Sequence, residues 1–316
     1  VTTGEEKALT KMEGVRSQII DKLENFPNEM IVGLNRRNPQ FFDPYRLNLE
    51  TGEMKMIAEN PGNITGWMTD HDGKLRVAMT TDGVSTSILY RATEKDEFQS
   101  VMTTNFKESI SPRFFTFDNK NVYATSNVGR DKEAAIIFDI TNGKELEELY
   151  VNENNDVEGL SYSRKRKEIT AATYTAEKSE RHFFSEESKK VYGRLQKELE
   201  GYEVAVTSAT KEEDKYIVRT YSDRCLGAYY LYDKTTDALS LLADVSPWID
   251  ESHMATMKPI SYQSRDGLTI HGYLTIPQGL EDAKNLPVVV NVHGGPWARD
   301  EWGFNPEVQF LANRGY

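Results

Sequence analysis

Short polar turns recur along this chain at a nearly constant spacing, and this repeat limits the fold more than any other feature. Each turn has a Thr-Gly, Asn-Gly or similar small polar pair and separates two β-prone runs. The turns fall at positions 4, 52, 143 and 237, which are 48, 91 and 94 residues apart. The stretch at 90–98 supplies the polar turn expected near 96. A fixed period of about 47 residues indicates a repeat architecture.

A second series of β-prone runs has the same spacing as the turns. Most of these runs follow a polar turn, and they occupy residues 75–80, 122–126, 168–173 and 216–220. Four short strands in each period are typical of a β-propeller blade. The sequence therefore predicts a mainly β protein with a partial β-propeller over 1–255, in which about five blades are present. The alternative is a β-sandwich with accidental regularity.

One repeat departs from this pattern between residues 185 and 201. Ser185 suits a helix N-cap, two glutamates follow it, and Gly201 suits the C-terminal end. The apolar residues between them recur at helical spacing: Val191, Tyr192, Leu195 and Leu199. We expect a helix of roughly 15 residues that packs on the side of the propeller rather than acting as a recognition element.

The sequence pattern of the last 60 residues differs from the blade repeat. Alternating residues at 260–264 and 268–276 flank an Asp-Gly turn and predict a hairpin. The apolar run at 287–292 predicts a strand buried on both faces of a parallel sheet, and Gly294 and Gly295 follow it. The segment from Asn305 to Gly315 has the N-cap, the proline and the terminal glycine of a helix, with Val308, Phe310 and Leu311 as its apolar residues.

The composition of the chain limits the classes of partner that it can bind. The net charge of −12 argues against nucleic acid, and the chain has no apolar run long enough to span a membrane. The single cysteine, Cys225, allows no intrachain disulfide. The acidic loop at 153–158 lacks the ligand spacing of a calcium loop, so no metal and no cofactor is expected. Neither the cytoplasm nor a bacterial periplasm is favoured as the compartment, and a homo-oligomer stays open.

The hairpin, the apolar run ending in His293-Gly294-Gly295-Pro296 and the helix look like the entry into an α/β-hydrolase domain. With a propeller directly before it, the chain resembles the prolyl oligopeptidase family of serine peptidases, and most closely its acylaminoacyl-peptidase-like branch. The stretches at 221–224 and 229–233 share this resemblance. It implies a propeller over 1–255 and the N-terminal part of the peptidase domain over 256–316.

The resemblance also implies roles for single residues. The backbone N–H of Gly295 would face the developing oxyanion, Gly294 would give the turn its freedom, and His293 would only shape the loop. Arg224 would either meet a substrate carboxylate or form a structural ion pair. Short peptides are the implied substrates, and the propeller would restrict their access.

The chain contains no G-x-S-x-G motif for a serine nucleophile. The nearest match, at 159–163, ends in serine and reads as a propeller strand. We therefore expect the nucleophile, acid and base to lie outside this sequence and the chain alone to be an inactive fragment. The alternatives are a non-catalytic propeller that binds partners and an esterase-type α/β hydrolase.

Overall fold

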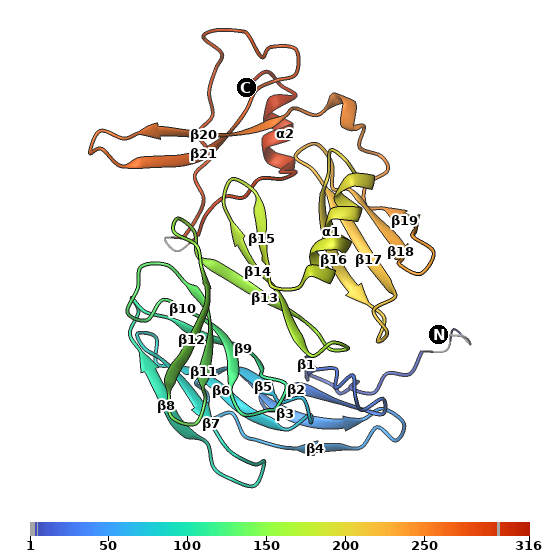
Figure 1. Cartoon of the computed structure of the whole chain (residues 1–316), viewed down its shortest axis with the longest axis vertical. Coiled ribbons are helices and arrows are strands. Elements are labelled where there is room, and N and C mark those ends of the chain that lie inside the picture. Colours follow the sequence, from blue (N-terminus) through green and yellow to red (C-terminus); the bar gives the residue numbers. More distant parts are fainter. Residues whose placement is uncertain (1–3, 5, 296–297) are drawn as a thin grey trace. The chain divides into compact units, whose positions relative to one another are not determined.

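The structure, a computed structural model, describes residues 4, 6–295 and 298–316. The chain divides into two compact units, Val1–Leu160 and Ser161–Tyr316. Antiparallel sheets dominate each unit (Figure 1). The beginning of the first predicted turn, at 2–3, and Pro296 of the glycine motif lie outside the described residues.

The first unit holds three four-stranded sheets, and in each sheet the strands pair in chain order. The first sheet comprises β1 (Ser17–Asp21), β2 (Glu29–Asn38), β3 (Phe41–Asn48) and β4 (Met54–Met56). The second comprises β5 (Ile64–Thr69), β6 (Leu75–Thr81), β7 (Thr86–Tyr90) and β8 (Gln99–Thr104). The third comprises β9 (Ile110–Phe115), β10 (Val122–Ser126), β11 (Ala134–Asp139) and β12 (Lys144–Val151).

The fourth sheet begins with β13 (Val157–Ser163), a strand that contains the boundary between the units, and continues through β14 (Glu168–Thr175) and β15 (Ser179–Phe183). The fifth sheet comprises β16 (Glu203–Ala209), β17 (Lys215–Tyr221), β18 (Ala228–Asp233) and β19 (Ala238–Asp244). Each of the five is an up-and-down sheet of the kind that forms a propeller blade. The predicted propeller with five blades is confirmed.

The repeat seen in the sequence has a direct structural meaning. The second series of β-prone runs forms the second strand of four successive sheets, β6, β10, β14 and β17. The turn before each of these strands contains one residue with positive φ: Gly73, Asn119, Lys167 and Glu213. Gly52, Gly143 and Asp237 also have positive φ, and they lie in turns between the third and fourth strands of their sheets.

Apolar side chains from two neighbouring sheets pack into a shared core. In the first unit, buried residues of the second and third sheets form one cluster that includes Val77, Ile88, Phe115 and Phe138. β-branched and aromatic residues suit these strands because they fill the space between pleated surfaces. This core therefore lies between the second and third sheets, as expected for blades that pack face to face.

A helix, α1 (Glu186–Glu198), follows β15 where the other sheets have a fourth strand. Ser185 is its N-cap and accepts a hydrogen bond from the backbone N–H of Ser188. Its apolar stripe packs on the fifth sheet: Val191, Leu195 and Leu199 share a buried cluster with Val204, Tyr216, Val218 and Tyr232. Both the helix and its packing on the side of a blade were predicted correctly.

The C-terminal segment contains the predicted hairpin of β20 (Met257–Gln263) and β21 (Thr269–Thr275). A short 3-10 helix, Glu251–His253, precedes it. The predicted buried strand at 287–292 is wrong for this structure. The segment has no strand, and Val288, Val290 and Val292 are 77%, 78% and 75% exposed. A strand of a parallel sheet needs neighbours for its backbone groups, and the described residues supply none there.

The last element, α2 (Pro306–Ala312), begins at its predicted N-cap, Asn305, whose side chain accepts from two backbone N–H groups. The prediction of its apolar face was partly wrong. Phe310 is 53% exposed, whereas Gln309 and Ala312 are buried. The guanidinium carbon of Arg314 lies 3.6 Å from the centroid of the Phe310 ring and covers part of that face.

Candidate functional site

The glycine loop predicted to stabilise an oxyanion lies at the surface of the second unit. His293, Gly294 and Gly295 are exposed, and Nδ1 of His293 donates a hydrogen bond to the carbonyl oxygen of Gly294 over 2.7 Å. The positive φ is at Gly295, with a value of 150°, rather than at Gly294. A residue with a Cβ rarely adopts this conformation, so glycine is favoured at position 295.

The chain after this loop is fastened to the turn between β14 and β15. The guanidinium of Arg299 donates to the carbonyl oxygens of Thr175 and Ala176, each over 2.9 Å. The hydroxyl of Tyr273, on β21, donates to the carbonyl of the next residue in that turn, Glu177, over 2.7 Å. These contacts join the C-terminal segment to the fourth blade.

Trp302 makes two further contacts of this kind. Its indole N–H donates to the carbonyl oxygen of Met257 over 2.9 Å. The ammonium of Lys178 lies 3.7 Å from the centroid of the Trp302 ring, a cation–π contact. Position 302 is therefore held both to the hairpin and to the β14–β15 turn.

Gln309 ties α2 to the fifth blade. Its side-chain N–H groups donate to the carbonyl oxygens of Asp223 and Ala255, over 2.9 and 2.8 Å, and its oxygen accepts from the N–H of Ala255 over 2.8 Å. The carboxylate of Asp223 accepts from the N–H of Met257 over 2.7 Å. All four residues are buried, so this polar cluster fixes the helix where few water molecules can replace the bonds.

Arg224 takes part in an ion pair. Its Nη2 lies 3.1 Å from Oε1 of Glu251, and the other oxygen of that carboxylate accepts from the hydroxyl of Tyr202 over 2.9 Å. Burial raises the pKa of Tyr202 to about 12, and the hydrogen bond to Glu251 adds to the rise. The structural ion pair considered for Arg224 is present, and a role in substrate binding stays a prediction.

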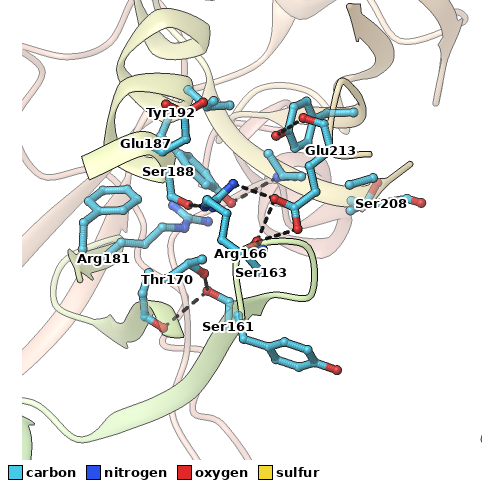
Figure 2. Close-up of a pocket in the computed structure, with 18 residues that line it drawn as sticks. Ser161, Ser163, Arg166, Thr170, Arg181, Glu187, Ser188, Tyr192, Ser208 and Glu213 are labelled. Carbon is cyan, nitrogen blue, oxygen red and sulfur yellow. Dashed lines mark hydrogen bonds and ion pairs between the residues drawn. The ribbon is translucent and has the colours of Figure 1, made fainter. Parts of the chain in front are cut away.

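A cavity of about 250 Å³ opens in the second unit, lined by residues of β13, β14, β15, α1, β16 and the turn before β17. Figure 2 shows Arg166 at its centre, with Glu213 facing it. Nη1 of Arg166 lies 2.6 Å from Glu213, whose carboxylate also accepts from the Ser163 hydroxyl. Nε of Arg166 pairs with Glu168 over 2.7 Å, and this bond holds the pKa of Glu168 below its ordinary value.

Sequence reasoning did not find this cavity. Its residues come from a stretch of more than fifty positions that reads as ordinary blade strands, and only the pairing of α1 with two sheets brings them together. Arg166 belongs to a short basic run at 164–167, and it is the one residue of that run that lines the cavity.

Among the described residues, no group of three or more His, Cys, Asp or Glu side chains is arranged to hold a metal ion. In the same part of the chain, no helix is both long and apolar enough to cross a membrane.

Comparison with known proteins places this fold. No protein-family model matches the chain. The dipeptidyl aminopeptidase BIII of Pseudoxanthomonas mexicana is 30% identical over 99% of this chain and 46% of its own length. A puromycin hydrolase structure shares the fold with a TM-score of 0.66 and 15% identity, over 95% of this chain and 49% of that one.

A structure from a study of two prolyl endopeptidases matches with a TM-score of 0.62 and 15% identity, over 91% of this chain and 44% of that one. The chain thus spans about half the length of the relatives it matches. By fold it is a β-propeller protein like these solved structures. By sequence and fold together, it is related to the prolyl oligopeptidase family of peptidases, as the glycine motif and the repeat indicated.

Proposed function

We propose that this chain is the propeller and the oxyanion loop of a serine peptidase that hydrolyses short peptides. The main support is the 30% identity to a dipeptidyl aminopeptidase. The match covers 99% of the chain and so includes the glycine loop. The attachment of the following loop to the fourth blade through Arg299 supports the proposal. It ties the residues near the reacting centre to the domain that would restrict access.

In this proposal the hydroxyl oxygen of a serine attacks the carbonyl carbon of the peptide bond, and the amine leaves as an acyl-serine ester forms. Water then hydrolyses the ester. The N–H of Gly295 donates to the oxyanion of each tetrahedral intermediate, a contribution of about 10²–10³ in rate. His293 shapes the loop, and Arg224 binds a substrate carboxylate only when Glu251 releases it.

The nucleophile is proposed to lie outside this sequence, because the chain contains no G-x-S-x-G turn. The propeller is proposed to admit only short, flexible peptides by excluding larger ones. Both features belong to the complete peptidase, and the 316-residue chain by itself is expected to be inactive.

A serine-directed fluorophosphonate probe tests this proposal. The 316-residue chain is expected to remain unlabelled, and a longer product of the same gene is expected to be labelled at one serine. Stoichiometric labelling of the 316-residue chain would contradict the assignment of the nucleophile. Turnover of p-nitrophenyl esters without turnover of short peptides by the longer product would favour an esterase instead.

A further inference from the structure

We propose that the cavity lined by α1 and strands of the fourth and fifth sheets binds a small organic carboxylate, and that Arg181 holds it. The inference rests on the geometry of this cavity and is independent of the proposed peptidase activity. Its volume of about 250 Å³ is slightly below the roughly 300–1,000 Å³ of sites for drug-sized ligands. The cavity therefore suits a small molecule or the end of a short peptide.

The charges around the cavity leave one cation without a partner. Of the two carboxylates that line it, Glu213 is paired with Arg166, and Glu187 is paired with Lys234. Arg166 is itself shared between two carboxylates. Arg181 forms no ion pair with any residue that the structure describes. The four charged side chains that line the cavity sum to zero, and Arg181 is the one among them without an ion pair to a described residue.

The Tyr192 ring holds the guanidinium of Arg181 in place, and no carboxylate of the described residues neutralises its charge. Its guanidinium carbon lies 4.6 Å from the centroid of the Tyr192 ring, on α1, and Figure 2 shows it on the side of Arg166 opposite Glu213. Stacking on an aromatic ring fixes the plane of a guanidinium while its N–H groups stay available. An arginine oriented in this way can donate two parallel hydrogen bonds to a carboxylate.

The rest of the lining favours an organic ligand over an inorganic ion. Phe183, Val191 and Val206 give the cavity an apolar wall. The hydroxyl of Tyr192 accepts from the N–H of Val206 over 3.4 Å, which leaves its own hydrogen to donate. A carboxylate with a small apolar body satisfies both the cation and this wall. Its source is either a free organic acid or the carboxyl terminus of a short peptide.

Calorimetric titration of the 316-residue chain tests the proposal with N-acetyl-phenylalaninate and with its uncharged carboxamide. The carboxylate is expected to bind at least tenfold more tightly than the amide. Arg181→Gln should weaken binding at least tenfold, and Arg181→Lys should weaken it less because a charge remains. Arg265→Gln, which removes an exposed charge at the tip of the β20–β21 hairpin, should leave the affinity unchanged.

A measurement on the unaltered chain keeps the proposal testable if the Arg181 variants fail to fold. The carboxylate should slow modification of Arg181 by phenylglyoxal, read by mass spectrometry, and should leave the rate at Arg265 unchanged. Equal binding of carboxylate and amide, unchanged affinity in Arg181→Gln, or no binding and no protection up to about 10 mM would overturn it. A dipeptide that binds more tightly than the N-acetyl amino acid would identify a peptide terminus as the source, and the reverse order a free acid.

Discussion

Gln309 should contribute strongly to the stability of the second unit. Replacing it with leucine keeps the size but removes the partners of three buried backbone groups, at Asp223 and Ala255. Each buried group left unpaired costs about 1–3 kcal/mol, so Gln309→Leu should lower the free energy of unfolding by about 3 kcal/mol or more. Chemical denaturation measures it. Gln196→Leu, at an exposed position of α1, should change stability by less than about 0.5 kcal/mol.

Tyr202 should make stability sensitive to alkaline pH. Its pKa in the folded chain is about 12, above the roughly 10 of a free tyrosine, so the unfolded chain loses this proton first. The stabilisation is complete below pH 10 and is lost as pH rises toward 12. Denaturation midpoints at pH 9, 10 and 11 should fall less steeply in Tyr202→Phe than in the unaltered chain. The same fall of the midpoint with pH in both proteins would contradict the role assigned to Tyr202.

Some of these residues were beyond the reach of the sequence. Gln309 looks like the polar side of an amphipathic helix, yet its amide binds backbone groups 54 and 86 positions away. Arg299 binds a carbonyl 124 positions away. Backbone carbonyls carry no residue identity, so no pattern in the sequence marks them as partners. The glycine pair, in contrast, is visible in the sequence itself, although the positive φ is at Gly295 and the freedom of the turn was assigned to Gly294.

At the scale of elements, the exposed segment 287–292 should contribute little to stability. Val290 is 78% exposed, whereas Val218, in the centre of the fifth sheet, is fully buried. Val218→Ala removes buried methyl groups and leaves a cavity, at a cost of about 2 kcal/mol. Val290→Ala should cost less than about 0.5 kcal/mol. A similar cost for the two substitutions, measured by denaturation, would show that the segment is packed in solution.

The same segment shows where prediction of elements fails. Strands β6, β10, β14 and β17 were predicted correctly because the strands that pair with them are adjacent in sequence. Each polar turn also predicts the strand that follows it. The run at 287–292 has equally strong β propensity. Propensity alone does not make a strand, since pairing partners must be present. The prediction inferred a sheet from one strand, and the described residues do not contain that sheet.

At the scale of the whole molecule, charge should control self-association. The chain carries a net charge of −12 and has an isoelectric point near 5.1, while Val288, Val290 and Val292 remain exposed. Repulsion between copies vanishes near the isoelectric point, so light scattering should be strongest near pH 5 and weak at pH 8. Threonine at all three valine positions should reduce the signal at pH 5. Equal scattering of both proteins would assign the association to another surface.

The architecture of the molecule was more predictable than its sites. A regular spacing can persist while the residues that form it differ. The repeat therefore predicted the blades even where their sequences have little in common. The cavity around Arg166 and Arg181 depends on how α1 packs against two sheets, and no local pattern encodes that packing.

The turns before the second strands show how little residue identity the repeat requires. One backbone shape recurs with glycine, asparagine, lysine and glutamate at its positive-φ position, in the order Gly73, Asn119, Lys167 and Glu213. The last two bear the steric cost that glycine avoids. Glycine at position 167 is therefore expected to relieve this cost, whereas glycine at position 213 would also remove the ion pair to Arg166. Four blades of this chain thus share one backbone conformation at this turn, while the side chains at the turn differ from blade to blade.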